Sequence, residues 1–304
     1  MVKTVHDIMN QPKKVICSLG GGFSSTALMP RVLLETTPKD MIEFVNCVLP
    51  NEHPDTWQLM DAMSEKLGID ITYIAYHPET KWQFVVKEDR GNKDKLSTPF
   101  DIFMQKGFIG SPRNDPCSSL LKRETIYQYI ISKYTPLNCI IAVGIHADEY
   151  ERSVAIRENW QNKRFKTLFP ILDLPHIPEG EQSRLLQEWY GVSIELYENG
   201  FEHNNCHGAC VKAGQSQWAR LWYYYPDVYA EWERLEQEWN STWSVIRGRR
   251  TILKIKRNGK MKYISLKEFR QDIIEPGIEH GNGMVGSLLA ELPGNPACMW
   301  CAAI

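Results

Sequence analysis

A glycine-rich turn near the start of the chain has the residue types that hold a phosphate. An apolar run over residues 15–19 leads into residues 20–26, which read Gly-Gly-Gly-Phe-Ser-Ser-Thr. Glycines bring backbone N–H groups near an anion, and the free N–H groups and dipole of a helix start favour negative charge. From the glycines alone, a turn without a ligand is an equal alternative. If the turn binds a nucleotide, we expect the contacts to come from Ser18, Gly20, Gly21, Gly22, Phe23, Ser24 and Ser25.

This turn fits neither of two common nucleotide-binding patterns. No Gly-Lys-Ser/Thr follows it, and Ser25 stands where the dinucleotide-binding pattern needs its last glycine. The turn resembles the PP-loop of the adenine nucleotide alpha hydrolase and ATP-pyrophosphatase superfamily, whose usual form is S-G-G-x-D-S. Gly20 takes the place of the first serine and Ser24 that of the aspartate. A turn of the form S-L-G-x-G-x-x-S is expected in the phosphoadenosine phosphosulfate (PAPS) reductase-like family of phage and bacterial type.

Three further polar segments hold candidate site residues: residues 51–56 and 144–153 follow predicted strands, and residues 111–123 join a loop to a helix start. Residues 51–56 and 111–123 lead into predicted helices, for which Asp55, Thr56 and Ser118 are candidate N-caps. Residues 144–153 would also suit a capped, solvated turn. However, residues 111–123 resemble the family's R-x-C-T-x-x-x-K-x signature, and residues 144–153 resemble its G-I-x-x-D-E-x-x-R element. The resemblance implies that Glu52, Thr56 and Gly144 lie beside the nucleotide, that Lys122 and Arg152 contact its anionic groups, and that Asp148 or Glu149 holds a magnesium ion or a hydroxyl.

The cysteines fall into two groups. Cys17, Cys47 and Cys139 lie in apolar stretches, where a cysteine is usually a small buried hydrophobe. The others lie among Gly, Pro, Asn and His, where cysteines in a reducing cytosol more often hold metal than form disulfides. The two close pairs among them suit zinc and an iron–sulfur cluster equally well. The family's paired cysteines and cysteine tail imply a 4Fe-4S cluster on Cys206, Cys210, Cys298 and Cys301, with Cys117 as an alternate ligand.

Alternating elements are predicted to position these residues. Strands are expected over residues 14–18, 42–48, 69–76 and 138–144, and helices over residues 26–35, 56–67 and 118–133. The alternation predicts an α/β fold with a doubly wound, mainly parallel sheet, which the resemblance makes adenine nucleotide alpha hydrolase-like. Most of these motifs follow a predicted strand, where ligands of such sheets bind. We expect a nucleotide-binding domain over residues 1–175 and a mostly helical, cysteine-containing region over residues 176–304.

In the second half, the spacing of aromatic residues predicts packing. Trp218 and Trp222 share one helix face, and Trp232 and Trp239 share another. The Asn-Gly pair at residues 258–259, flanked by alternating residues, predicts a hairpin.

Composition describes a globular chain without a strong overall charge. The chain has 304 residues, 43% of them hydrophobic, which is enough for a sizeable core. A net charge of −2 lacks the basic surplus of most nucleic-acid binders, although residues 247–262 hold many Lys and Arg and no acidic residue. A solvated face is the commoner explanation for such a run, but it would also steer a polyanion such as nucleic acid. No segment resembles a membrane span or a signal peptide, so we expect a cytoplasmic protein without a membrane partner.

The resemblance implies an enzyme that binds ATP or a related adenine nucleotide for sulfur transfer. ATP would adenylate an acceptor, with nucleic acid as a natural candidate, and sulfur from a cluster or a persulfide donor would then displace AMP. A second hypothesis is reduction of a sulfonucleotide by a thioredoxin-like donor. The terminal E-C-G-L-H of PAPS reductase is absent, so Cys298 or Cys301 would have to be the nucleophile. A third is a nucleotide-sensing or partner-binding protein with structural zinc.

Overall fold

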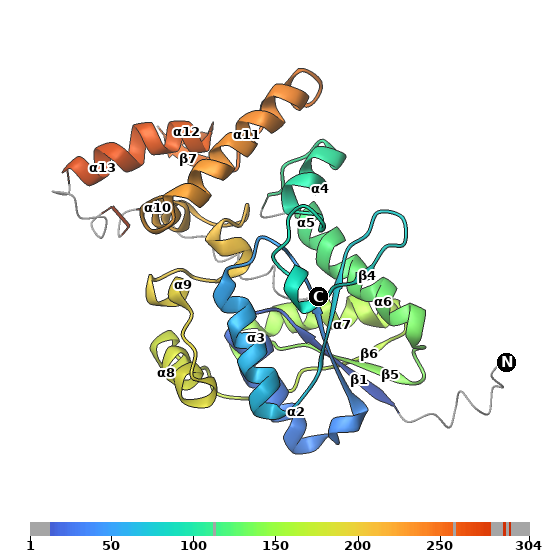
Figure 1. Ribbon diagram of the computed structural model, residues 1–304. Helices are drawn as coiled ribbons and strands as arrows, with labels where there is room; N and C mark the ends of the chain where they lie inside the picture. Colours follow the sequence, from blue (N-terminus) through green and yellow to red (C-terminus); the bar gives the residue numbers. More distant parts are fainter. Residues whose placement is uncertain (1–12, 112–113, 258–259, 281–287, 290–291, 293–304) are drawn as a thin grey trace.

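The computed structural model describes residues 13–111, 114–257, 260–280, 288–289 and 292. A six-stranded sheet lies at its centre, with helices packed around it (Figure 1). The strands, in chain order, are β1 (Lys14–Leu19), β2 (Ile42–Cys47), β3 (Ile71–Ala75), β4 (Gln83–Phe84), β5 (Cys139–Ala142) and β6 (Lys166–Leu168). Their order across the sheet is β4-β3-β2-β1-β5-β6.

Parallel pairing brings the carboxyl ends of the main strands to one edge of the sheet. β1 pairs with β2 and with β5, β2 pairs with β3, and β5 pairs with β6, all in parallel, whereas β4 runs antiparallel to β3. The chain leaves β1 toward β2 and later returns to the other side of β1 as β5, so the direction of winding reverses between them. Such a reversal opens a crevice beyond the strand ends, where ligands of open α/β sheets bind. The prediction of an α/β fold with a mainly parallel sheet is therefore confirmed.

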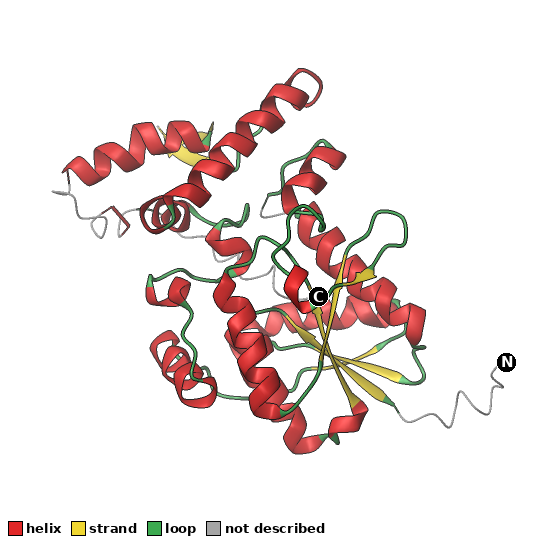
Figure 2. Ribbon diagram, viewed as in Figure 1, coloured by secondary structure: helices red, strands yellow, loops and turns green. Residues whose placement is uncertain are grey.

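Helical segments connect the strands and form most of the second half (Figure 2). The first half contains η1 (Phe23–Leu28), α2 (Met29–Thr36), η2 (Lys39–Met41), α3 (Pro54–Leu67), η3 (Lys87–Asp89), α4 (Pro99–Lys106), α5 (Pro116–Ser118), η4 (Ser119–Glu124), α6 (Thr125–Lys133), η5 (Ala147–Glu149) and α7 (Tyr150–Asn162). The second half contains α8 (Glu179–Tyr190), α9 (Glu195–Glu198), η6 (Asn205–Gly208), α10 (Gln215–Tyr224), α11 (Pro226–Arg247), β7 (Leu253–Arg257), β8 (Lys260–Ile264), α12 (Leu266–Phe269), η7 (Arg270–Ile274) and α13 (Glu275–His280).

Alternating side chains of β1 give the sheet an apolar core on each face. Ile16 belongs to a buried cluster with Ile126 of α6 and Trp160 of α7. Cys17, its neighbour in sequence, belongs to the opposite cluster, which includes Leu33 of α2 and Leu59 of α3. A strand that is buried on both faces requires this continuous apolar sequence, because successive side chains point in opposite directions.

Helix starts differ in detail from the prediction. α3 begins at Pro54, and its N-cap is His53, whose Nδ1 accepts the Asp55 N–H at 3.2 Å. The prediction that Asp55 or Thr56 caps this helix is therefore wrong. A helical run also begins at Pro116, before Ser118, so the predicted Ser118 cap is wrong as well. In both cases proline occupies the first helical position, where its fixed φ favours a helix start.

Buried tryptophans form the core of the second half, as their spacing predicts. Trp218, Trp232 and Trp239 are buried, and Trp218 contacts Trp232 edge to face at 6.0 Å between ring centroids.

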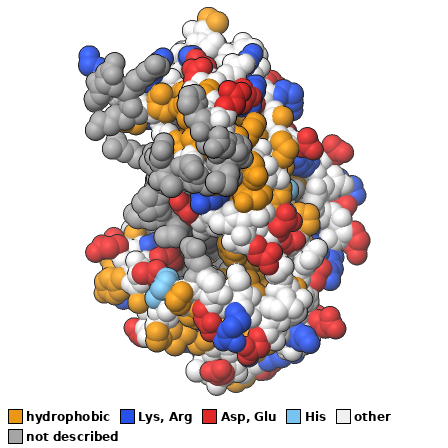
Figure 3. Space-filling view, turned by 90° about the vertical axis from the view of Figure 1, so that its left-hand side faces the viewer, with side chains coloured by type: hydrophobic (Ala, Val, Ile, Leu, Met, Phe, Trp, Pro, Cys, Tyr) orange, Lys and Arg blue, Asp and Glu red, His pale blue; other side chains and the backbone are white. Residues whose placement is uncertain are grey.

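The predicted hairpin is also confirmed, because β7 pairs antiparallel with β8. Figure 1 shows α10 to α13 as a group set apart from the sheet. On one face of the molecule, hydrophobic, acidic and basic side chains are interspersed in both the upper and the lower part (Figure 3).

The two halves share one apolar cluster, which includes Leu59 of α3 and Leu186 of α8. Tyr190 of α8 donates its hydroxyl to the Ala27 carbonyl oxygen at 2.7 Å. The boundary expected near residue 175 stays a prediction. Among the described residues, no helix combines the length and the apolarity that crossing a membrane demands.

Candidate functional site

The turn after β1 is held in shape by its own hydroxyl groups. The Gly20 N–H donates to Ser25 Oγ at 3.1 Å, and the Gly21 N–H donates to Thr26 Oγ1 at 2.8 Å. Gly21 has φ +89°, and a Cβ there would lie 2.6 Å from Thr56 Cγ2, so glycine is required at this position. Because these two N–H groups are used inside the turn, an anion would meet the N–H groups at the start of η1, which precede the first intrahelical donor, the Thr26 N–H.

The segment after β5 lies directly against this turn. A Cβ on Gly144 would come within 2.7 Å of Ser25 Cα and 3.0 Å of the Ser24 carbonyl oxygen. Gly144 therefore lets the chain beyond β5 touch the chain beyond β1. This contact lies between β1 and β5, where the winding direction of the sheet reverses. It places the start of η1 next to residues 146–152.

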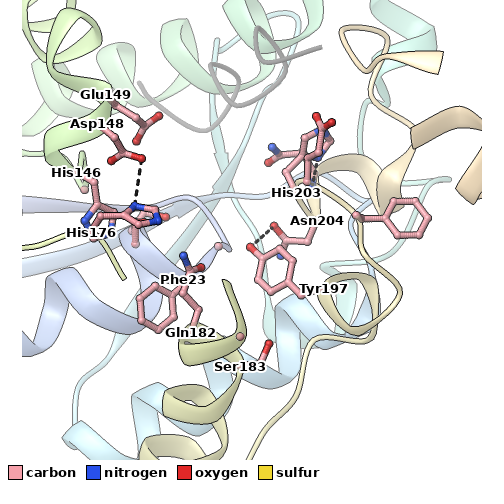
Figure 4. Close-up of a pocket in the computed structure, with 18 of the residues that line it drawn as sticks. Phe23, His146, Asp148, Glu149, His176, Gln182, Ser183, Tyr197, His203 and Asn204 are labelled. Atoms are coloured by element: carbon pink, nitrogen blue, oxygen red, sulfur yellow. Dashed lines mark hydrogen bonds and ion pairs between the residues drawn. The ribbon is translucent and has the colours of Figure 1, made fainter. Parts of the chain in front are cut away.

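A cavity of about 480 Å³ opens beside this contact, a volume within the roughly 300–1,000 Å³ of small-molecule sites. Its walls come from the start of η1, from residues 144–152, from α8 and from residues 197–205. Figure 4 shows side chains from these segments pointing toward one space. The predicted site residues that line it are Gly22, Phe23, Ser24, Ser25, Gly144, Asp148, Glu149 and Arg152.

The described side chains of this cavity carry more negative than positive charge. Asp148, Glu149 and two further glutamates face one guanidinium, that of Arg152, which donates a hydrogen bond to Glu149. Asp148 lies 3.3 Å from Nδ1 of His176 (Figure 4). A polyphosphate would be repelled by this set of charges unless a divalent cation accompanied it. Carboxylate oxygens together with substrate phosphates are the usual ligands of Mg²⁺.

His146 is a site residue that sequence reasoning missed. It is only 6% exposed and lines the cavity, yet neither ring nitrogen has a hydrogen-bond partner in the described part of the chain. Burial lowers its pKa below the ordinary histidine value, which makes the ring neutral near pH 7. A buried polar atom without a partner costs about 1–3 kcal/mol, so a hydrogen bond to a ligand would be favourable here. The only sequence sign is its place between Gly144 and Asp148.

Lys122 lies by a different cavity, one of about 10 Å³ that Ser18, Gly20 and Thr56 also line. Its Nζ is 3.2 Å from Glu52 Oε1, and both side chains are buried. Glu52 Oε2 in turn accepts the Cys206 N–H at 2.7 Å. The structure therefore separates the predicted residues into two groups, one around the large cavity and one around this buried ion pair.

Asn204 joins two parts of the chain. One is the segment of residues 203–214 that carries Cys206 and Cys210, here called the cysteine loop, and the other is the glycine turn of residues 20–26. The Nδ2 atom of Asn204 donates to the Gly21 carbonyl oxygen at 2.9 Å and to Thr56 Oγ1 at 3.1 Å. Sequence reasoning gave Asn204 no role, because an asparagine before a cysteine has no characteristic signal. Its contacts span more than a hundred residues of sequence and depend on the packing of the second half against the first.

The three cysteines predicted for the core are buried, but Cys117 in α5 and Cys210 are buried as well, so among the described cysteines Cys206 alone is partly exposed. Cys17, Cys47 and Cys139 are buried, and burial raises the pKa of the Cys47 and Cys139 thiols to about 12. Cys206 stands on the loop before α10 with φ 52° in the left-handed region, which is strained for a side-chain-bearing residue.

The segment of Cys117 is tied to that of Cys210 by an ion pair of 3.3 Å between Asp115 and Lys212. Cys117 therefore lies on a segment next to the loop that carries both Cys206 and Cys210. Cys117, Cys206 and Cys210 do not belong to the group of possible ligand atoms that lie within 4.8 Å of one another in the described residues, so a cysteine site for zinc or an iron–sulfur cluster stays a prediction. Cys298 and Cys301 lie outside the described residues.

Nitrogen and oxygen ligands meet at the start of α3. Possible ligand atoms of His53, Asp55 and Glu195 lie within 4.8 Å of one another. Asp55 Oδ2 accepts the Glu195 N–H at 2.8 Å, and the ring of His207 stands edge-on to that of His53 with centroids 4.4 Å apart. This set would suit a harder ion than the cysteines would.

The site thus consists of an acidic cavity at the reversal of the sheet, a buried Lys122–Glu52 pair and a cysteine loop that hydrogen bonds to Glu52 and to the glycine turn. No family model, curated protein or solved structure matches the chain.

Proposed function

We propose that the chain binds ATP or a related adenine nucleotide in the large cavity and uses it for sulfur transfer, as a PAPS reductase-like member of the PP-loop superfamily. The proposal includes the finer fold assignment, a doubly wound sheet of adenine nucleotide alpha hydrolase-like type. One observation carries it. A cavity of about 480 Å³ stands at the reversal of a mainly parallel sheet, with a helix start on one side and the carboxylates of Asp148 and Glu149 on the other.

The phosphates would lie against the start of η1, with Mg²⁺ held between them and the carboxylates. Ser24 stands where the superfamily's loop has aspartate, and Asp148 and Glu149 supply carboxylates to the same cavity. An acceptor oxygen would attack the α-phosphorus of ATP, and the bond from that phosphorus to the bridging oxygen would break, so that pyrophosphate would leave. A sulfur nucleophile would then displace AMP from the activated acceptor. Arg152 and the N–H groups at the helix start would stabilise the charge that develops on the phosphate oxygens.

Cys206 and Cys210 would hold an iron–sulfur cluster together with Cys298 and Cys301, with Cys117 as the alternate ligand. Such a cluster, when bound, supplies reactive sulfur and electrons. The cysteine loop touches the glycine turn through Asn204, so the two parts of the site are neighbours.

Calorimetric titration of the anaerobically purified chain with ATP tests this proposal. We expect binding that depends on Mg²⁺ and that weakens at least tenfold in the double variant Asp148→Asn, Glu149→Gln, because removing both carboxylates removes the ligands of the cation. Asp227→Asn, an exposed aspartate at the start of α11, is the matched control. Absence of ATP binding with or without Mg²⁺ would contradict the proposal. Iron, zinc and sulfide analysis of the same preparation identifies the metal at the cysteines.

A further inference from the structure

A second concave surface, the hairpin groove, lies beyond the cysteine loop. It has a volume of about 380 Å³ and is formed by the β7–β8 hairpin, residues 108–111 and residues 211–215. Among the described residues that line it, the charged ones are Arg250 and Lys254, and none is acidic. The groove therefore has the opposite charge to the large cavity.

Aromatic and apolar side chains stand exposed beside these cations. Tyr263 is 47% exposed and Met261 is 62% exposed, although both line the groove. Lys254 Nζ lies 4.8 Å from the ring centroid of Tyr263, and the guanidinium of Arg250 lies 6.0 Å from that of Phe108. Positive charge along a groove, together with aromatic rings on which bases stack, is the combination that binds single-stranded nucleic acid.

The groove is fixed in place by hydrogen bonds to its backbone. Glu236 of α11 accepts the N–H groups of Ile252 and Leu266, each at 2.7 Å, on either side of the hairpin. Gln215 donates its Nε2 to the Lys254 carbonyl oxygen at 2.9 Å, which ties β7 to the loop after Cys210. Since the surface is already ordered, a ligand would not have to pay for ordering it.

The cysteine loop runs from the large cavity to the hairpin groove. Residues 203–205 line the cavity and residues 211–215 line the groove, so Cys206 and Cys210 lie on the chain between them. A Cβ on Gly110, a residue of the groove, would lie 2.8 Å from Val211 Cγ2 and 3.5 Å from Pro116 Cδ, so the segment of Cys117 lies next to Gly110. A nucleic-acid strand in the groove would thus lie next to the chain segments that carry Cys210 and Cys117.

We infer that the hairpin groove binds single-stranded nucleic acid, with a base stacked on Tyr263 and phosphates paired with Lys254 and Arg250. The role of that strand as the sulfur acceptor rests on the proposed function, whereas its binding does not. An acidic peptide would satisfy the two cations but would make no use of the exposed ring of Tyr263.

Fluorescence anisotropy with the full chain tests this inference. The probes are labelled oligo(dT) and oligo(U) of about 12 nucleotides, within the span of one such site, and no adenine nucleotide is added. We expect Tyr263→Ala to weaken binding about fivefold or more through lost stacking, and Tyr263→Phe to retain it. Lys254→Ala should lower the slope of log affinity against log salt by about 0.7, the value for one phosphate contact on a single strand. The controls are Tyr223→Ala, which removes a tyrosine 45% exposed elsewhere, and Lys267→Ala.

The inference is overturned if Tyr263→Ala binds both oligonucleotides as tightly as wild type, or if a duplex or poly-glutamate binds as tightly as the single strands. Circular dichroism melts show that each variant is folded. ATP titration of the same preparations separates the two proposals. Oligonucleotide binding without ATP binding leaves the groove assignment standing and refutes the nucleotide site, and the reverse result does the opposite.

Discussion

Gly144→Ala is expected to damage nucleotide binding without adding any charge or polar group. The new Cβ would lie 2.7 Å from Ser25 Cα, roughly 0.7 Å short of ordinary contact, and 3.1 Å from the Ser25 nitrogen. All the crowded atoms belong to the backbone of the turn, so no flexible side chain can move away. Overpacking of this kind costs about 1–3 kcal/mol of unfolding free energy. Relief of the clash must push the start of η1 away from β5, and ATP affinity should fall about tenfold or more.

The assay combines urea denaturation with ATP titration in the presence of Mg²⁺. Gly91→Ala is the matched control, because no heavy atom lies within 4 Å of a Cβ at that position and its φ is not in the left-handed region. The control should keep wild-type stability and affinity. If Gly144→Ala loses stability by the expected amount but binds ATP with wild-type affinity, the turn beside Ser25 does not hold the phosphates. That result would refute the reasoning about the site while leaving the packing argument intact.

Two further predictions concern buried titratable side chains. His146→Gln should change the free energy of unfolding by less than about 1 kcal/mol, because the ring has no hydrogen-bond partner to lose. The same variant should bind ATP about fivefold more weakly, because one hydrogen bond to the nucleotide is lost. Equal ATP affinity of variant and wild type in calorimetry would exclude a contact between His146 and the nucleotide. Burial raises the pKa of Glu236 from 4.5 to about 7, so the folded chain favours its protonated form. The resulting stability is present below pH 4.5 and is lost as the pH rises through 7, a difference of about 3 kcal/mol. Urea denaturation at pH 5 and pH 8 should show this fall in wild type and not in Glu236→Gln, and the same pH dependence in both proteins would contradict the assignment.

Local patterns predicted four of the six strands, β1, β2, β3 and β5, and missed the short strands β4 and β6. The run of residues 15–19 is apolar without alternation, which is typical of a strand buried on both faces, and Ile16 and Cys17 do face opposite clusters. The motifs at residues 20–26, 51–56 and 144–153 follow β1, β2 and β5, and parallel pairing brings the ends of these strands to one edge, whereas residues 111–123 follow helix α4. The spacing of Trp218, Trp232 and Trp239 likewise predicted burial, because helical periodicity depends only on residues close in sequence.

Pairs that are far apart in sequence had no such signal. Lys122 was expected to face an anionic ligand, and its pairing with Glu52 depends on how β2 and η4 meet across the sheet. Arg152 hydrogen bonds to Glu149, and Asp148 pairs with His176. The spacing of residues 144–153 does not indicate whether these side chains pair with protein groups or with a ligand. His146 was missed because a histidine without a partner is recognisable only once its surroundings are known.

Glu52 couples the glycine turn to the cysteine loop. Its two oxygens bind Lys122 and the Cys206 N–H, and the side chain is only 6% exposed. A carboxylate buried to this extent cannot lose its cation without a large penalty. Any anion that draws Lys122 away must therefore also change how Glu52 holds Cys206, a residue already strained at φ 52°. If the proposed nucleotide binding displaces Lys122, it would therefore also change the conformation of the cysteine loop.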